Sequence, residues 1–389
     1  MDEVVAIWGH EPEVVHIERV EARPGSTSPL DPPLQAVIEA ALDERGITSL
    51  WRHQADAIAS VRNGNHTVLV AGTASGKSLA YQVPIAEAIA SEPKSTALCV
   101  YPTKALTNDQ LRSFSRLGVD RLVASTYDGD TDTDARRWAR RHANVLLTNP
   151  DMLHVGILPN HDLWKDFFHR LAFVVVDEMH TMRGIFGSHV AHVLRRLRRL
   201  AAHYGSDPTF VFTSATIGNP SELATDMIGA PVSVIEHDSS PQGAKTFVLW
   251  NPEIEDPVKG TRGSPLVDAT RVFADLVTRD VHTIVFSRSR KSTELMFRWA
   301  RDRLPQSLED RVAPYRGGYL ADDRRRIEEA LASGELTGVI ATNALELGID
   351  IGSLDAAIIT TFPGTIASFR QQAGRAGRNQ SDSIAVLVA

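Results

Sequence analysis

The sequence contains little cysteine, no long apolar run and no excess of positive charge. Its 389 residues include a single cysteine, Cys99, which excludes an internal disulfide and a cysteine-based zinc cluster. No stretch approaches the roughly 18 consecutive apolar residues of a membrane span, and the N-terminus lacks the basic and apolar segments of a signal peptide. These absences predict a cytoplasmic protein without a membrane partner, in which Cys99 has a packing role.

The formal net charge of -7 argues against a protein that coats nucleic acid through bulk charge. It leaves room for a groove with its own positive lining, because binding depends on the local potential. Arginines cluster at residues 136–141, 195–199 and 324–326. For each cluster, a solvated helix face and a nucleic-acid contact are equally consistent with the sequence.

Short apolar runs alternate with longer amphipathic stretches, which predicts an α/β fold. Strands that are apolar on both faces are typical of a parallel sheet covered by helices, so two doubly wound domains in tandem are expected. The predicted strands are residues 66–71, 96–101, 145–147, 173–176 and 209–212, then 282–286, 338–341, 356–359 and 383–388.

Composition predicts the domain boundaries. Residues 1–45, which are rich in proline, are expected to form an irregular N-terminal arm with one helix, and residues 46–235 the first domain. Residues 236–265, rich in Pro, Gly, Ser and Asp, are predicted to be a linker, and residues 266–389 the second domain. Because the chain stops inside an apolar strand pattern, we expect it to be cut from a longer protein.

A phosphate-binding loop is predicted at residues 71–78, AGTASGKS, between a strand and a helical stretch. Its backbone amides can bind the phosphates of ATP, Lys77 can reach the β- and γ-phosphates, and the Ser78 hydroxyl can ligate Mg²⁺. Ala74 stands where this kind of loop usually has glycine, which predicts a loop without positive φ at that residue. The other expected ATP-binding residues of the loop are Thr73, Ser75 and Gly76.

Two acidic residues, Asp177 and Glu178, follow the apolar run 173–176 in the segment DEMH. Ligand sites of α/β sheets lie at the carboxyl ends of strands, where these residues are expected. Asp177 is predicted to hold Mg²⁺ through water, and Glu178 to orient and deprotonate the attacking water. The alternative, carboxylates that merely cap the next helix, is disfavoured by the phosphate loop.

Two arginines near the end of the sequence, Arg375 and Arg378, each follow a glycine in the segment QQAGRAGR. An arginine that reaches the γ-phosphate when two domains close stabilises transition-state charge, typically by roughly 10³–10⁵ in rate. The three motifs together predict ATP hydrolysis in a cleft between two domains. A surface helix end with two arginines is the alternative.

The order of these motifs resembles a superfamily 2 helicase core over nearly all of residues 50–380. The resemblance implies two RecA-like domains with ATP and Mg²⁺ between them. It implies that Gln54, in a segment similar to the Q motif, reads the adenine edge. In residues 341–350, which resemble motif V, it places Gly348 and Asp350 toward the nucleotide.

The same resemblance implies contacts with nucleic acid and a link between the two sites. Residues 102–106 and 148–151 resemble motifs Ia and Ib, and residues 214–216 resemble motif III, although an ordinary turn fits Ser-Ala-Thr equally well. The implied nucleic-acid contacts are Thr103, Lys104, Thr148, Asn149, Thr342 and Asn343. The implied coupling residues are His180, Ser214, Thr216 and Gln371.

Four segments, TASGKS, DEMH, residues 315–319 and QQAGRAGR, together resemble the MrfA-like (mitomycin-repair) DNA helicases, which are distantly akin to the RecQ group. The resemblance implies an ATP-dependent 3′→5′ helicase on single-stranded or partly duplex DNA in DNA repair, with a C-terminal four-cysteine domain absent here. Tyr315 and Tyr319 are equally consistent with packing. An RNA helicase of DEAD-box type, which DEMH and Gln371 disfavour, and a nucleotide-gated DNA clamp that does not unwind remain alternatives.

Overall fold

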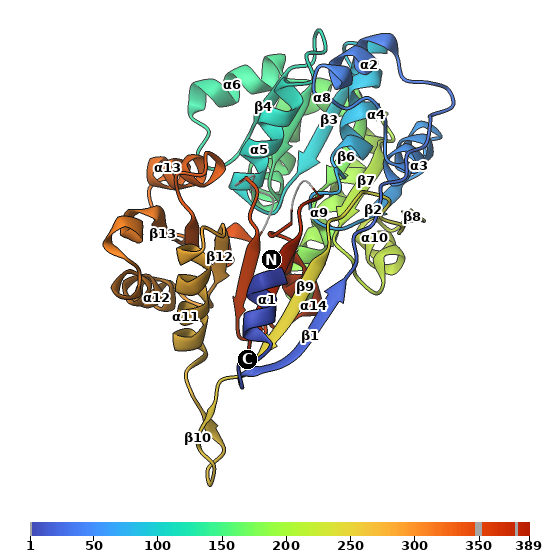
Figure 1. The fold of residues 1–389 in the computed structure, drawn as a ribbon. Helices are drawn as coiled ribbons and strands as arrows, with labels where there is room; N and C mark the ends of the chain where they lie inside the picture. Colours follow the sequence, from blue (N-terminus) through green and yellow to red (C-terminus); the bar gives the residue numbers. More distant parts are fainter. Residues whose placement is uncertain (1, 347–351, 378–379) are drawn as a thin grey trace. The chain divides into compact units, whose positions relative to one another are not determined.

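A computed structural model describes residues 2–346, 352–377 and 380–389, which fold as two compact units (Figure 1). The first unit comprises Ser26–Ser240, and the second combines Met1–Gly25 with Pro241–Ala389. Each unit is built on its own mainly parallel sheet, as the alternating pattern predicts. None of the helices in the described ranges has the length and apolar character needed to cross a membrane.

The sheet of the first unit has the strand order β4-β5-β3-β6-β7-β2-β8, and every recorded pairing is parallel. The strands are β2 (Thr67–Val70), β3 (Thr96–Val100), β4 (Ala124–Thr126), β5 (Val145–Thr148), β6 (Leu171–Val176), β7 (Thr209–Ser214) and β8 (Ser233–Ile235). The five strands predicted for this region are confirmed. β4 and β8 were missed because they are three residues long and only partly buried.

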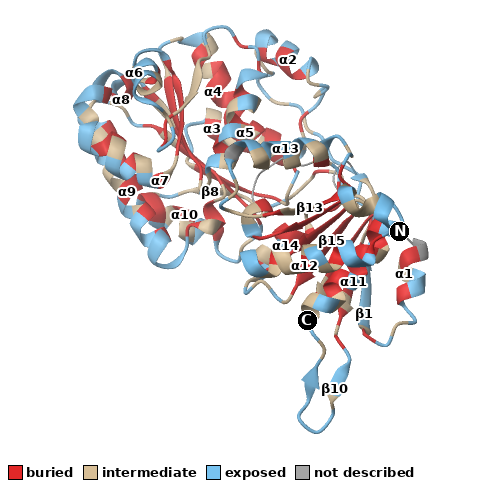
Figure 2. Ribbon diagram, turned by 90° about the vertical axis from the view of Figure 1, so that its left-hand side faces the viewer, coloured by how far each residue is buried: buried red, intermediate tan, exposed pale blue. Residues whose placement is uncertain are grey.

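Helices cover both faces of this sheet, so its central strands are buried throughout (Figure 2). They are α2 (Ala36–Asp43), α3 (Arg52–Arg62), α4 (Leu79–Ser91), α5 (Lys104–Ser115), α6 (Thr133–His142), α7 (Pro150–Met152), α8 (Lys165–His169), α9 (Gly184–His203) and α10 (Pro220–Ile228). Side chains of α3, α4 and α5 share one hydrophobic cluster, and those of α6, α8, α9 and α10 share another. Cys99 is fully buried in the first cluster, which confirms its predicted packing role.

The sheet of the second unit has the order β1-β9-β16-β15-β12-β14-β13, parallel except where β1 meets β9. Its strands are β1 (Val14–Val20), β9 (Lys245–Trp250), β12 (Thr283–Phe286), β13 (Val312–Tyr315), β14 (Gly338–Ala341), β15 (Ala356–Thr360) and β16 (Ser383–Val388). Its helices are α1 (Asp2–Trp8), α11 (Pro265–Thr278), α12 (Arg290–Arg303), α13 (Ala321–Ala332) and α14 (Ile366–Ala373). An exposed hairpin of β10 (Ile254–Asp256) and β11 (Thr261–Arg262) extends from this unit.

Two predicted boundaries are wrong. The segment expected to be a linker contains β9, which pairs along its whole length with β16, so that Lys245 lies opposite Ser383 and Trp250 opposite Val388. The segment expected to be an irregular arm contains α1 and β1, and β1 closes the edge of the second sheet against β9. Both strands pair with distant segments. β1 is almost entirely exposed, so its burial gives no pattern, whereas β9 alternates buried and half-buried residues and ends in the apolar run 247–250, a signal that the composition of residues 236–265 outweighed in the prediction.

The N-terminal helix is anchored by Trp8, which is only 4% exposed. Its ring meets Trp250 edge-on with centroids 5.9 Å apart, and its Nε1 donates to an Asp275 carboxylate oxygen at 3.3 Å. Truncating a buried tryptophan removes its transfer free energy and leaves a cavity, at a cost of about 3–5 kcal/mol. The N-terminal segment is therefore part of the core of the second unit.

We expect Trp8→Ala to lower the free energy of unfolding by about 3–5 kcal/mol, because the cavity opens beside Trp250. Urea unfolding followed by circular dichroism measures the change. The neighbouring Ile7→Ala is the control, since Ile7 is 41% exposed and its loss is expected to be small. Equal, small effects of the two substitutions would restore the interpretation of residues 1–45 as an arm that packs against nothing.

Candidate active site

The phosphate loop, residues 71–78, joins the end of β2 to the start of α4 in the first unit. Ala74 and Gly76 have φ values of 58° and 74°, so the prediction that Ala74 avoids positive φ is wrong. The loop imposes the left-handed conformation there, although a Cβ disfavours it by roughly 1–2 kcal/mol. At Gly76 the positive φ favours glycine, and a Cβ would lie 2.4 Å from Gln54 Nε2, so a larger residue would displace the Gln54 side chain. The loop also contains Thr73, Ser75, Lys77 and Ser78.

Side chains hold the loop from both of its ends. The Lys77 ammonium donates to the carbonyls of Ala71 and Gly72 at 3.1 and 2.5 Å, which places its charge over the loop. The Gln54 amide donates to the Gly76 carbonyl at 3.0 Å. Gln54 therefore lies against the phosphate loop, where it is in reach of a bound nucleotide and also fixes the loop's shape.

Three residues that sequence reasoning missed also support the loop. The His53 ring bonds the Ser75 carbonyl through Nε2 at 3.0 Å and the Ser239 hydroxyl through Nδ1 at 2.8 Å. Burial lowers the pKa of His53, which favours the neutral ring, and this ring links the Ser75 carbonyl to the Ser239 hydroxyl. Asp238 accepts the Gly72 amide at 3.0 Å. Asp238 and Ser239 had no local signal, because they fall in the segment predicted to be a linker.

Asp177 directly follows β6 and is only 7% exposed. Its carboxylate accepts hydrogen bonds from the Thr213 hydroxyl and from the Glu178 amide, the latter at 3.0 Å. The Tyr81 hydroxyl donates to the other carboxylate oxygen at 3.4 Å. Burial, with the nearby Glu178 charge as the second cause, raises the pKa of Asp177 to about 6. Three hydrogen bonds therefore fix the position of this carboxylate.

Glu178 adopts a left-handed conformation with φ of 52°. A non-glycine residue in this region costs of order 1–3 kcal/mol, and such strain is typical of functional sites. One of its carboxylate oxygens lies 3.4 Å from Nδ1 of His180. That nitrogen already accepts the Ala215 amide at 3.1 Å, so the contact is not an ion pair between charged groups. The left-handed backbone at Glu178, and not an ion pair with His180, therefore sets the direction of the Glu178 carboxylate.

The segment 214–216 connects the two catalytic loops. Ser214 ends β7, and its carbonyl accepts the Ala71 amide at 3.1 Å, which joins it to the phosphate loop. Its neighbour Ala215 bonds His180 of DEMH. Ser214 and His180 are therefore brought together as the resemblance implies, whereas Thr216 is exposed.

The residues expected to contact nucleic acid in this unit follow the carboxyl ends of β3 and β5. Thr103 and Asn149 each accept a backbone amide at the start of a helix, α5 and α7 respectively. Lys104 forms an exposed ion pair with Asp130 at 2.7 Å. Thr148 is fully buried, and its hydroxyl donates to a backbone carbonyl at 2.7 Å. That hydroxyl is therefore not available to contact a nucleic-acid strand, contrary to the prediction for Thr148.

In the second unit, Arg375 is only 2% exposed. Its guanidinium donates to the Glu346 carbonyl at 3.1 and 2.6 Å, which ties the QQAGRAGR segment to the motif V segment. Gln371 and Thr342 are buried, whereas Asn343 is exposed. The motif predicts that Arg375 reaches the γ-phosphate, with an exposed helix end as the alternative, but in the structure its guanidinium is buried against the Glu346 carbonyl. Three predicted residues lie outside the described ranges: Gly348, Asp350 and Arg378.

Two further side chains, both missed from the sequence, hold these segments in place. The Glu346 carboxylate accepts the Ser368 hydroxyl at 2.5 Å and the Gln372 amide at 2.9 Å, both from α14. Lys245 of β9 donates to the Ala373 carbonyl at 2.7 Å and to a carbonyl three residues later at 2.8 Å. Burial lowers the pKa of Lys245 to about 8. The strand missed by the sequence analysis thus fixes the end of α14.

Comparisons with known proteins agree with this arrangement. Residues 51–223 match the family described as DEAD/DEAH box helicase, and residues 268–380 match the helicase conserved C-terminal domain. The chain is 42% identical, over 97% of its length, to an uncharacterized ATP-dependent helicase, YprA, of Bacillus subtilis, of which it covers 51%. It is 43% identical, over 95% of its length, to the ATP-dependent helicase hrq1 of Schizosaccharomyces pombe, of which it covers 36%.

The fold matches a crystal structure of the DUF1998 helicase MrfA bound to DNA with a TM-score of 0.94 and 41% identity, over 100% of this chain and 52% of that one. The chain thus spans about half the length of that protein and of YprA. Because two helicase families account for most of the sequence and the motifs lie on two RecA-like sheets, the chain belongs to the superfamily 2 helicases, as an ATP-dependent helicase core of the MrfA-like kind.

Proposed function

We propose that the protein is an ATP-driven motor that moves 3′→5′ along single-stranded DNA and separates duplex DNA during repair. The observation that carries the proposal is the convergence of the phosphate loop, Asp177 and Glu178 at one edge of a parallel sheet. The DNA substrate is supported by the DNA-bound structure of MrfA, which shares 41% identity with this chain. Polarity, a repair role and a cytoplasmic location stay predictions from the sequence.

The described residues fit ATP and Mg²⁺. The amides of Gly76, Lys77 and Ser78 donate to no described residue, so they are available to phosphate oxygens. Asp177 has no ion-pair partner among the described side chains, although it is buried and has a raised pKa. Ser78 and Asp177 would hold Mg²⁺, which would neutralise phosphate charge and favour phosphoryl transfer.

The chain's own residues would then perform three tasks. Lys77 would bind the terminal phosphates, and Glu178 would orient a water molecule and accept its proton. Arg378 would supply positive charge when two domains close over the nucleotide. Arg375, which is only 2% exposed, would instead act through its bonds to the Glu346 carbonyl, which join the QQAGRAGR and motif V segments.

The proposed grip on the strand uses helix starts and short polar side chains. Thr103, Lys104 and Asn149 in the first unit, with Thr342 and Asn343 in the second, would contact phosphates and sugars. Such contacts position the strand without reading its bases, so binding would be independent of sequence and would weaken as salt rises. Lys104 would have to leave its exposed ion pair with Asp130 to contact the strand. This would cost little, because exposed ion pairs contribute only about 0–1 kcal/mol to stability.

The proposal is tested by ATP hydrolysis of this chain without polymer and with single-stranded DNA, duplex DNA or single-stranded RNA. We expect stimulation by single-stranded DNA. Stimulation by RNA alone would indicate the DEAD-box alternative, and equal rates in all four would contradict a translocase. A DNA-stimulated ATPase without strand displacement would indicate the nucleotide-gated clamp for this chain.

We expect Glu178→Gln to bind ATP with near-normal affinity while turnover falls roughly 10²–10⁴-fold, because the amide cannot accept the proton of water. Lys77→Ala is expected to lose nucleotide binding instead. Equilibrium binding of a fluorescent ATP analogue and steady-state hydrolysis separate the two effects. Glu39→Gln, an exposed substitution on α2, is the control. Undiminished turnover in purified Glu178→Gln would remove Glu178 from its assigned role.

We expect Asp177→Asn to raise the thermal midpoint of the nucleotide-free protein in chelator at pH 7 to 8, while hydrolysis is lost. The pKa of Asp177 is about 6 in the folded protein, against an ordinary value of 3.8. Between these two pH values the folded state therefore binds more protons than the unfolded state. Stability of the parent protein therefore falls as pH rises from about 4 to about 6. The gain from asparagine should shrink as the pH is lowered through this window. A gain that is constant with pH, or that also appears in exposed Asp120→Asn, would contradict the assignment.

A further inference from the structure

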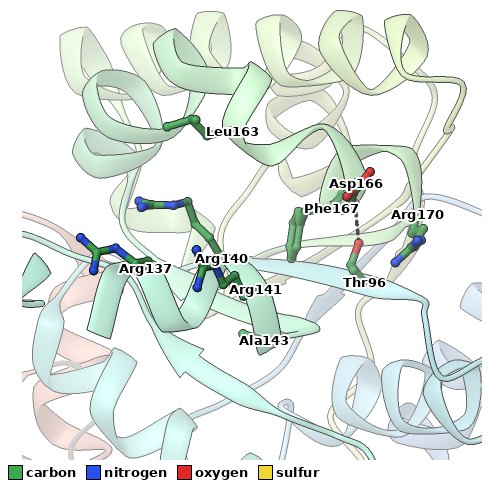
Figure 3. A pocket seen from close by; sticks show the side chains of 9 residues that line it. All are labelled: Thr96, Arg137, Arg140, Arg141, Ala143, Leu163, Asp166, Phe167 and Arg170. Atoms are coloured by element: carbon green, nitrogen blue, oxygen red, sulfur yellow. Dashed lines mark hydrogen bonds between the residues drawn. The ribbon is translucent and has the colours of Figure 1, made fainter. Parts of the chain in front are cut away.

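A pocket of about 540 Å³ lies in the first unit (Figure 3), and its lining includes none of the proposed catalytic residues. Its floor includes Thr96, the first residue of β3, and Ala143, just before β5. The residues expected to contact nucleic acid follow the opposite, carboxyl ends of the same strands. A five-residue strand is roughly 15 Å long, so the pocket is separate from that edge.

Four arginines line the pocket from two directions. Arg137, Arg140 and Arg141 project from α6 on one side, and Arg170 lies at the end of α8 on the other (Figure 3). Asp166 is the single acid of the lining, so four positive charges face one negative charge. This local excess stands out on a chain whose formal net charge is -7.

The guanidinium groups are poorly compensated by other side chains. Arg137 pairs with Asp134 at 3.4 Å, but both are exposed and such a pair is weak. Arg140 donates to the neutral Tyr127 hydroxyl at 3.2 Å. Arg141 and Arg170 have no carboxylate within ion-pair distance among the described residues. The described side chains therefore provide little negative charge to balance these four guanidinium groups.

A purely structural explanation accounts for part of this charge. The α6 and α8 helices both end at the pocket, and each helix C-terminus carries roughly half a negative charge that favours arginine. Together with Asp166, the two termini offset about two of the four charges. Stabilisation of helix ends therefore explains Arg140 and Arg141 in the last turn of α6 and leaves about two positive charges unmatched.

The shape and composition of the pocket favour phosphate. Planar guanidinium groups bind phosphate oxygens in pairs, and a volume of about 540 Å³ exceeds that of a single inorganic anion. The buried ring of Phe167 forms an apolar wall.

We propose that this pocket binds phosphate groups, supplied by the backbone of a DNA strand that runs beyond the motor groove. The site would add affinity for long strands without taking part in ATP hydrolysis. Free polyphosphate presents the same chemistry and is the other source to be tested. The inference rests on the proposed function only in its choice of DNA as the source.

The double substitution Arg141→Ala/Arg170→Ala tests the pocket, because neither side chain makes a recorded bond and the fold is expected to be retained. We expect the dissociation constant for a long single strand to rise about tenfold, while that for a strand only long enough for the motor groove is unchanged. Each lost phosphate contact on a single strand reduces the salt slope of log K by about 0.7, so a decrease of about 1.4 is expected. Fluorescence anisotropy over a salt series measures both.

Arg298→Ala/Arg303→Ala on α12 is the matched control, since it removes the same charge from exposed positions in the other unit. Its long-strand affinity should stay near that of the parent. Thermal unfolding of all variants verifies the fold. ATPase activity at saturating short strand should be the same in the parent and the pocket variant, so failure of the proposed motor function would appear as missing DNA stimulation in both.

Pyrophosphate binding, measured by calorimetry in a Lys77→Ala background that disables the phosphate loop, separates the two sources. Loss of long-strand affinity in the pocket variant supports the DNA backbone. Loss of pyrophosphate binding alone keeps a phosphate site and assigns it to free polyphosphate. The proposal is overturned if the pocket variant binds the long strand with unchanged affinity and salt slope and the Lys77→Ala protein with an intact pocket binds no pyrophosphate.

Discussion

Parallel hydrogen bonding among β6, β7 and β2 is the constraint on which the active site depends. Val70 lies opposite Ser214, so β2 and β7 end at the same level, and Val176 lies opposite Phe212, so β6 ends two residues earlier and Asp177 comes next to Thr213. Each strand is buried on both faces, which leaves its carboxyl end as the place where polar loops emerge. The phosphate loop, DEMH and the segment 214–216 are adjacent because their strands are neighbours.

The sheet edge that carries the catalytic residues contains strained backbone and a buried carboxylate. Both lower the stability of the unit, and contacts elsewhere in the unit must offset this cost. Ala74 and Glu178 adopt left-handed backbone conformations, and Asp177 is a carboxylate with a raised pKa in a buried position. Each feature is unfavourable alone, and each is held by contacts from surrounding elements, such as the Thr213 hydroxyl on Asp177. A nucleotide and its cation would relieve part of this cost, which couples binding to the conformation of the edge.

The second unit shows how a motif can depend on a strand far away in sequence. Its arginine-bearing segment is joined to the motif V segment through Arg375 and Glu346, and β9 supplies Lys245 to the end of α14. β9 in turn pairs with β1, so residues near the N-terminus belong to the same hydrogen-bonded layer.

The sequence by itself determined the α/β class, nine strands and the positions of the phosphate loop, Asp177 and Glu178. These follow from local patterns: runs that are apolar on both faces, and polar residues at their carboxyl ends. Tertiary structure alone decided the strands β1 and β9, the φ of Ala74, the burial of Arg375 and Thr148, and the support from Asp238 and Lys245. Most of these depend on partners far apart in the chain, and the local pattern of a segment does not say with which distant segment it pairs. The arginine pocket has the same origin, because the chain shows a cluster on α6 but only the fold brings Arg170 to face it.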